Sequence, residues 1–172
     1  MKSSLFPSIV NLARNKLQGP ISTQLENVNV IDLSLNNFVG SIPAHIGEIP
    51  AISLYGTIPR SLGNWKSLIY LNLGQNKLTG SVPEELECIT SLRYLDLNGD
   101  QFEGSFPVAL EKFQELEILK LAGNRFEGRI PKFIGDLHHL RILMLASNSF
   151  NESIPEGVMK LENLQFISLS RN

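Results

Sequence analysis

This chain of 172 residues contains a single cysteine, Cys88, so a disulfide bond within the chain is excluded. Its net charge is only −2 at pH 7, which removes the electrostatic argument for binding nucleic acid or an anionic membrane surface. No apolar run approaches the ~18 residues of a membrane span, and the segment Met1–Pro7 has no apolar run long enough for a signal peptide. We therefore expect a soluble segment that does not insert into a membrane and carries no targeting signal.

The sequence also lacks the motifs of common catalytic and metal sites. It contains no Gly-x-Ser-x-Gly nucleophile elbow and no phosphate-binding loop of the Gly-x4-Gly-Lys-Ser/Thr type. His138 and His139 are adjacent, so their side chains diverge, and no cysteine or carboxylate cluster at zinc spacing accompanies them. We predict no enzyme, no cofactor and no metal site.

What the chain has instead is a repeat of 24 residues, each turn of which is marked by an asparagine or, once, by an aspartate. A fixed period of this length predicts a solenoid, because each turn leaves an apolar face that only its neighbour covers. Apolar residues lie five and three positions before each marker, which is the alternation of a short strand with one buried face. The markers are Asn15, Asn36, Asn76, Asp100, Asn124, Asn148 and Asn172.

After each marker follow an apolar residue, a glycine and an apolar-proline pair, and then apolar residues spaced by three. The glycine predicts a tight turn and the proline an extended corner. The spacing by three suits a short helical or 3-10 segment on the outer side. The predicted fold is an α/β repeat: one solenoid over residues 1–172 with a parallel inner β-sheet. Turns of 24 residues fill 61–172, and irregular turns of 21, 21 and 19 residues fill 1–60.

The marker asparagines predict a structural ladder. An amide side chain both donates and accepts hydrogen bonds, so stacked asparagines satisfy backbone groups that stacking removes from water. A line of asparagines presented to a ligand is the less favoured alternative. Asp100 accepts but does not donate when ionised, so we predict that this turn has the weakest rung after residue 76.

The period is broken between residues 50 and 58. The pair Ile52 and Leu54 is followed at once by the Gly56 corner, without a marker loop. Either this pair forms a shortened strand or one strand is absent and the sheet is interrupted. The shortened strand is favoured, because it keeps the hydrogen-bond ladder paired.

The pattern L-x-x-L-x-L-x-x-N-x-L-x-G-x-I-P resembles the plant-type leucine-rich repeat. It runs through Leu68–Pro83, Leu92–Pro107, Leu116–Pro131 and Leu140–Pro155. The resemblance implies a right-handed horseshoe from the ectodomain of a receptor-like protein or receptor-like kinase. It further implies a peptide or protein ligand, a possible co-receptor, and a place at the plasma membrane on the extracellular face, in defence or developmental signalling.

The chain departs from complete members of that family. It lacks paired-cysteine caps and a serine/threonine kinase domain, and it stops on the marker Asn172, so we expect an internal fragment or a truncated gene product. The alternatives to a receptor segment are a soluble inhibitor or decoy of the polygalacturonase-inhibitor type and a non-functional remnant. Uncapped ends would also favour end-to-end self-association.

Strand positions between the buried pairs face the inner surface. Tyr70 and Tyr94 lie side by side on neighbouring strands, beside Asn72 and Asp96. Tyrosine and arginine dominate the energetics of protein interfaces, so this patch suits recognition of a partner; routine variation on a solvated sheet face is the alternative. The candidate ligand-binding residues are Tyr70, Asn72, Arg93, Tyr94, Asp96, Glu117, Lys120, Arg141 and Met144.

Asn151-Glu152-Ser153 is the one Asn-x-Ser/Thr triplet in the chain. It makes Asn151 a glycosylation candidate on a corner loop, provided that the chain enters the secretory pathway. An unmodified loop is the alternative.

Overall fold

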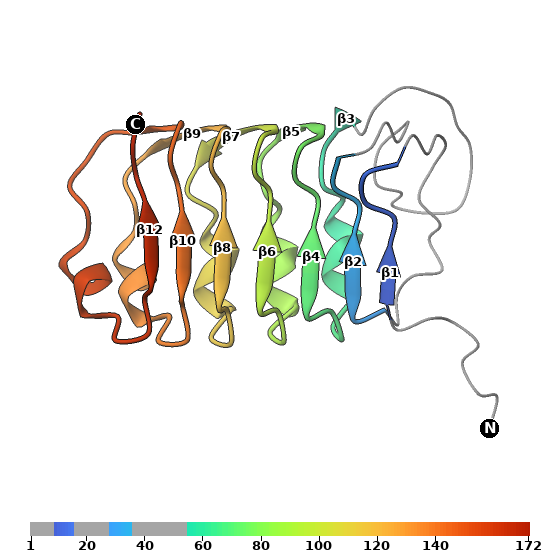
Figure 1. The fold of residues 1–172 in the computed structure, drawn as a ribbon, viewed down its shortest axis with the longest axis horizontal. Coiled ribbons are helices and arrows are strands. Elements are labelled where there is room, and N and C mark those ends of the chain that lie inside the picture. The colour runs from blue at the N-terminus through green and yellow to red at the C-terminus, as the bar shows by residue number, and fades with distance from the viewer. Residues whose placement is uncertain (1–8, 16–27, 36–54) are drawn as a thin grey trace.

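The computed structural model describes residues 9–15, 28–35 and 55–172, which form a solenoid of stacked turns (Figure 1). From residue 60 onward the chain passes repeatedly through a short outer 3-10 helix, a strand of an inner sheet and, except in the last turn, a strand of a second sheet. In Figure 1 the inner sheet faces the viewer and the 3-10 helices lie behind it. The predicted solenoid with a parallel inner sheet is confirmed.

Within the described residues, seven parallel strands form the inner sheet, and their buried leucines are in register. Leu71 pairs with Leu95, Leu95 with Leu119, and Leu119 with Leu143. Each of these four side chains is at most 1% exposed, so successive turns cover one another as the repeat predicts. In sheet order the strands are β1 (Ile9–Asn11), β2 (Val30–Asp32), β4 (Tyr70–Asn72), β6 (Tyr94–Asp96), β8 (Ile118–Lys120), β10 (Ile142–Met144) and β12 (Phe166–Ser168).

The irregular junction does not add a shortened strand to the inner sheet, contrary to the favoured prediction. Ile52 and Leu54 lie outside the described residues, but β2 pairs directly with β4, with Ile31 opposite Leu71. No strand of the inner sheet therefore lies between β2 and β4, and this sheet is not interrupted there either. The physical reason is that parallel pairing needs only two strands brought side by side, and the crossover between them tolerates a longer connection.

The residues after Asn76, Asp100, Asn124 and Asn148, together with Tyr55–Gly56, form a second parallel sheet, which the sequence analysis did not predict. The glycines assigned there to tight turns, Gly80, Gly104 and Gly128, do have positive φ angles of 74°, 88° and 76°, but they lie within short strands. In sheet order these strands are β11 (Ser149–Phe150), β9 (Arg125–Gly128), β7 (Gln101–Ser105), β5 (Lys77–Gly80) and β3 (Tyr55–Gly56).

A row of phenylalanines fills the space under the second sheet. Phe102 and Phe126 stack with ring centroids 6.2 Å apart, and Phe126 and Phe150 stack at 6.4 Å. All three side chains are buried, at no more than 6% exposed. Stacked rings at this spacing add to the area that they bury, so this row fixes the distance between the later turns.

The outer segments are 3-10 helices, as the spacing by three indicates. Each begins directly after the proline of its corner, for example after Pro83 with φ −69° and ψ 143°. Proline suits this position because its fixed φ fits an extended chain and because no hydrogen bond here requires a backbone N–H. The helices are η2 (Arg60–Asn64), η3 (Glu84–Cys88), η4 (Val108–Lys112), η5 (Lys132–Asp136) and η6 (Glu156–Lys160).

The marker asparagines form the predicted ladder. The amide of Asn124 donates to Leu97 O of the preceding turn at 2.7 Å and to Leu121 O of its own turn at 3.0 Å, while its Oδ1 accepts from Phe102 N at 3.0 Å. Asn148 and Asn172 repeat this bridging pattern. The amide nitrogen of Asn76 donates to Leu33 O of an earlier turn and to Leu73 O of its own turn. Asn15 donates within its own turn, and Asn36 lies outside the described residues.

Asp100 supplies only half of the asparagine function at its rung. Its Oδ1 accepts from Leu78 N at 2.9 Å. Its Oδ2 is buried and has no hydrogen-bond partner among the described residues. Burial raises the pKa of Asp100 to about 7 and the nearby Asp96 adds to this, against the lowering effect of the Leu78 and Asn76 amides. This geometry is the physical basis for the predicted weak rung.

Candidate ligand-binding surface

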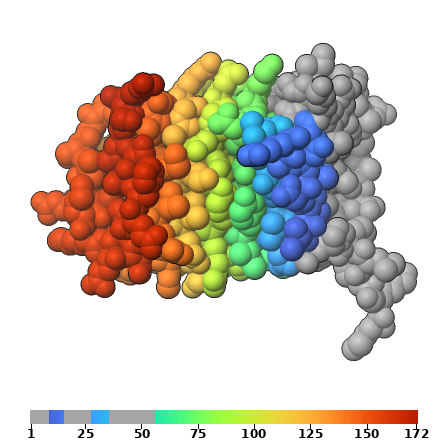
Figure 2. Space-filling model, in the orientation of Figure 1, coloured from blue at the N-terminus to red at the C-terminus, as the bar shows by residue number. Residues whose placement is uncertain are grey.

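All nine candidate residues lie on, or directly before, four neighbouring strands of the inner sheet, β4, β6, β8 and β10. The alternation that buries the leucines turns the strand residues of this set toward the open side of the sheet. Arg93, Glu117 and Arg141 precede their strands, and their side chains are 54%, 35% and 52% exposed. Figure 2 looks onto this face, where each turn contributes one strip to a continuous surface. The structure thus brings the predicted set together on one face.

Two tyrosines form the aromatic part of this surface. The rings of Tyr70 and Tyr94 stack with their centroids 4.0 Å apart and their planes 14° apart. Both side chains are half-buried. Burial raises the pKa of Tyr94 to about 12, with the Asp96 carboxylate adding to the effect, and burial likewise raises the pKa of Tyr70. Both phenols are therefore neutral donors at any physiological pH.

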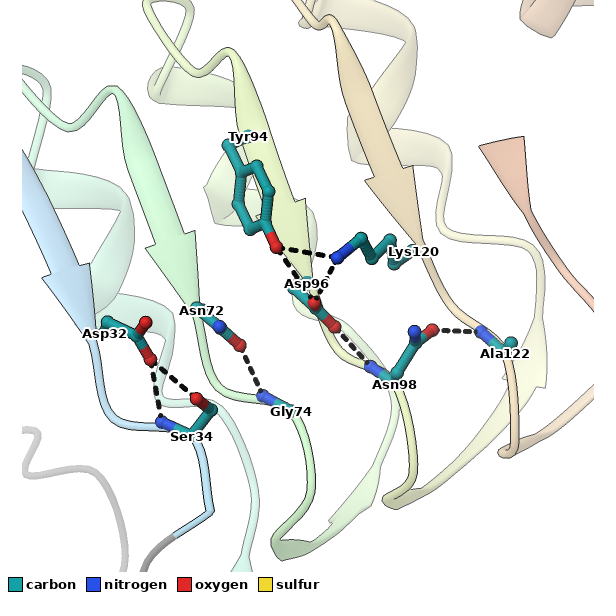
Figure 3. A network of polar contacts seen from close by, with 9 residues as sticks. All are labelled: Asp32, Ser34, Asn72, Gly74, Tyr94, Asp96, Asn98, Lys120 and Ala122. Carbon is teal, nitrogen blue, oxygen red and sulfur yellow. Dashed lines mark hydrogen bonds and ion pairs between the residues drawn. The ribbon is translucent and has the colours of Figure 1, made fainter. Parts of the chain in front are cut away.

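A polar triad holds Tyr94 in place (Figure 3). Lys120 Nζ donates to the Tyr94 hydroxyl at 2.8 Å and to Asp96 Oδ2 at 3.1 Å, and the Tyr94 hydroxyl donates to the same carboxylate oxygen at 3.1 Å. The ammonium also lies 5.1 Å from the centroid of the Tyr94 ring. The side chains of Lys120 and Asp96 alone are 24% and 11% exposed, so their attraction is less screened than that of a surface pair. These hydrogen bonds order the three side chains before any partner binds, so they lose little conformational entropy on binding.

The carboxylates and amides at the strand ends have a structural role that sequence reasoning missed. Asp96 Oδ1 accepts from Asn98 N at 3.0 Å, and Asn72 Oδ1 accepts from Gly74 N at 3.1 Å. Asp32 makes the same bond to Ser34, as Figure 3 shows. Each bond turns the chain at the end of its strand. Asn72 and Asp96 are both only 8% exposed, so they shape the surface more than they contribute contact area.

A shallow hollow of about 450 Å³ lies at these strand ends. Besides the predicted Asn72, Tyr94, Asp96 and Lys120, its lining includes Asn98, whose Oδ1 accepts from Ala122 N at 2.6 Å. Asn98 is a residue the sequence analysis did not select. The signal was available: two positions before the marker the other turns from residue 55 on carry glycine, alanine or serine, and only this turn carries a large amide.

A charged row borders the surface one residue before the strands begin. Arg93 lies 3.5 Å from Glu117, which lies 3.8 Å from Arg141, which donates to Gln165 at 3.4 Å. The arginines are more than half exposed, so each pair contributes at most about 1 kcal/mol to stability. Arg93 also pairs with Glu115 at 3.3 Å, so the two arginines are balanced by two glutamates. These weak, exposed pairs leave the row available to a partner at small cost.

An apolar row runs between the charged row and the strand-end polar residues. Its members are paired in register from strand to strand, so the row is unbroken across the sheet. Met144 lies beside it on β10 and is half-buried. Exposure rises at the ends of the row, to 61% at Ile9 and 50% at Phe166. The members are Ile9, Val30, Tyr70, Tyr94, Ile118, Ile142 and Phe166.

Other features of the described residues offer less chemistry. A hollow of about 610 Å³ lies away from the inner sheet, at the proline corners that include Pro59, Pro83 and Pro107. No group of three metal-ligating side chains is found among residues 9–15, 28–35 and 55–172. In these same ranges no helix has the length and apolar content needed to cross a bilayer.

Comparison with known proteins agrees with this architecture. A family model described as "Leucine rich repeat" matches residues 53–102 and 114–172. No curated protein sequence matches the chain. Among solved structures, the chain is similar to the ectodomain of the Arabidopsis thaliana membrane receptor kinase GASSHO1/SCHENGEN3 in complex with CASPARIAN STRIP INTEGRITY FACTOR 2. The two align with a TM-score of 0.80 and 34% identity, over 94% of this chain and 18% of that one.

Two further solved structures align over a similar extent. The Arabidopsis receptor kinase HAESA, in complex with the peptide hormone IDA and the co-receptor SERK1, aligns with a TM-score of 0.78 and 34% identity, over 93% of this chain and 28% of that one. The PEPR1–AtPEP1 structure aligns with a TM-score of 0.82 and 29% identity, over 96% of this chain and 25% of that one. The chain thus spans less than a third of the length of these three neighbours.

Proposed function

The chain belongs to the leucine-rich-repeat family in its plant receptor-ectodomain form, and from this premise we propose that its inner sheet binds a peptide or protein ligand. The observation that carries the proposal is the unbroken apolar row, flanked on one side by the Tyr94–Asp96–Lys120 triad and on the other by the balanced charged row. Recognition, without catalysis, is the activity that such an open surface supports.

Each part of this surface makes a different contribution to affinity. The apolar row supplies area to be removed from water on binding, and the tyrosines supply the residue type that most often dominates interface energetics. The triad is already ordered, so a ligand that contacts it loses little further conformational freedom. The charged row, with both signs present, suits a ligand of mixed charge.

The neighbours support the class of ligand and of partner. HAESA is solved with a peptide hormone and a co-receptor, and the plant peptide hormone receptor RGFR1 is solved in complex with RGF2. We propose that this segment likewise contacts a peptide on the extracellular face of a plant cell, in defence or developmental signalling, with a co-receptor as second partner.

The test is selection of displayed random peptides on the intact chain, followed by affinity measurements on the enriched sequences. We expect Tyr94→Ala to weaken binding by about 30-fold, the effect of losing a hot-spot residue worth about 2 kcal/mol. Glu103→Ala on the second sheet is the matched control, because Glu103 is exposed but lies off the inner sheet. Enriched peptides that bind both variants as well as the unchanged chain would contradict the proposal.

A further inference from the structure

The second sheet sorts its side chains into an inward and an outward row. In three successive turns a buried phenylalanine is followed by an exposed polar residue: Glu103 after Phe102, Glu127 after Phe126, and Asn151 after Phe150. Asn151 continues the sheet by one residue beyond β11, because its N–H donates to Gly128 O at 3.0 Å. The alternation of a strand therefore directs the Asn151 side chain outward, in line with two glutamates.

This outward position coincides with the one Asn-x-Ser/Thr triplet of the chain, Asn151-Glu152-Ser153, and all three residues are exposed. We propose that Asn151 is a site of N-linked glycosylation, an inference that rests on the extracellular placement given under the proposed function. In the modification, Asn151 Nδ2 loses a proton and bonds to the anomeric carbon of a lipid-pyrophosphate-linked oligosaccharide. The bond from that carbon to the phosphate oxygen breaks, and the lipid pyrophosphate leaves.

The contrast with Asn148, three residues earlier, explains why the fold accepts a glycan at one asparagine and not at the other. Asn148 is only 9% exposed and its amide donates to the carbonyls of Leu121 and Leu145, both at 3.0 Å. Substitution of that nitrogen would break a rung of the ladder. Asn151 lies outside the ladder, so a sugar on its nitrogen removes none of these bonds.

The position of the glycan also assigns a role to this edge of the solenoid. Glu152 and Ser153 line a hollow of about 400 Å³ together with Arg129 and Lys132, away from the inner sheet. A glycan on Asn151 would extend over this edge and leave the apolar row and the triad uncovered. The edge formed by the second sheet near β9 and β11 is then a solvent-facing side, and partners approach elsewhere.

The experiment is secretion of the full chain from plant cells behind a heterologous leader peptide, followed by mass spectrometry of the intact protein. We expect one glycan per chain, absent from Asn151→Gln and from Ser153→Ala. Release by an amidase that cleaves N-linked glycans converts Asn151 to aspartate, and mass spectrometry of proteolytic peptides then locates the converted residue. Because no ligand is involved, failure here is separate from failure of the proposed ligand binding.

A matched control is available one turn earlier. The double substitution Glu127→Asn with Arg129→Ser, made together with Asn151→Gln, places the triplet Asn-Gly-Ser at the equivalent outward position. We expect this variant also to carry one glycan. Secreted unchanged protein without a glycan, alongside a glycosylated control, overturns the assignment of Asn151.

Discussion

Replacing Asp100 by asparagine should stabilise the protein and remove most of the pH dependence of this rung. In the other rungs the amide group donates to two carbonyls, as Asn124 does to Leu97 O and Leu121 O. The equivalent carbonyls for residue 100 are those of Leu73 and Leu97. Oδ2 of Asp100 has no hydrogen-bond partner among the described residues, whereas an asparagine Nδ2 at this position would donate to both carbonyls.

The size of the effect follows from the pKa of the buried carboxyl group, which is about 7 in the folded chain against 3.8 when exposed. Between these values the native state binds more protons than the unfolded state, so stability falls as the pH rises from about 4 to about 7 and is constant above. Full ionisation lowers the free energy of unfolding by about 4 kcal/mol. The part lost between pH 5 and pH 8 is about 2–3 kcal/mol.

Urea unfolding at pH 5 and pH 8 measures this difference. The one tryptophan, Trp65, is 7% exposed and reports the loss of packing by fluorescence. Asp100→Asn should be more stable than the unchanged chain at both pH values, with the larger gain at pH 8. Asn148→Asp should become less stable as the pH rises from 5 to 8. Asp136→Asn, at an exposed position, should leave the free energy of unfolding unchanged at both pH values.

Equal losses of stability by the unchanged chain and by Asp100→Asn between pH 5 and pH 8 would contradict this prediction. A carbon-13 titration that finds the Asp100 carboxyl group ionised at pH 5 would contradict it as well. Either result would mean that water or a side-chain rearrangement solvates Oδ2 and that the marker position tolerates a charge.

Three further predictions concern the packing of the core, the close approach of two glycines and the exposed ion pairs. Leu119→Ala should destabilise the chain by about 2–5 kcal/mol in urea unfolding, whereas Met159→Ala, at a side chain 70% exposed, should be almost neutral. Gly135→Ala should lower the thermal midpoint more than Gly128→Ala. A Cβ at Gly135 would lie 2.6 Å from Gly157 Cα, whereas at Gly128 nothing lies within 4 Å and only the φ of +76° is unfavourable. Raising NaCl from about 0.1 M to about 1 M should change stability by less than about 1 kcal/mol, because the charged row is exposed; a larger fall would contradict the weak contribution assigned to these pairs.

The inner sheet was predictable because its signal repeats. The apolar pair before each marker recurs in every turn, and a one-residue slip would expose all of its leucines, so the register of Leu71 with Leu95 follows from spacing alone. The second sheet was not predictable in the same way. Its strands β7 and β9 each contain one apolar residue, Phe102 or Phe126, and a glycine with a positive φ, so no alternation of apolar residues distinguishes them from a turn.

The candidate site was predictable in position but not in role. The spacing places Asn72 and Asp96 on the open face, and the structure places them there, yet both side chains accept backbone hydrogen bonds that close the strand ends. Arg93 and Glu117 were selected as charges offered to a ligand, and they lie within 3.5 Å of each other. Contacts between side chains of neighbouring turns depend on rotamers, and a repeat pattern read from one sequence does not specify them.

The direct pairing of β2 with β4 has a consequence for how such molecules diversify. Ile31 and Leu71 are 40 positions apart and adjacent in the sheet, while Leu71 and Leu95 are 24 apart and equally adjacent. The spacing of the contact residues is thus independent of the length of chain in each coil. Insertions and deletions can therefore be accommodated in the connecting loops without displacing a position on the inner sheet.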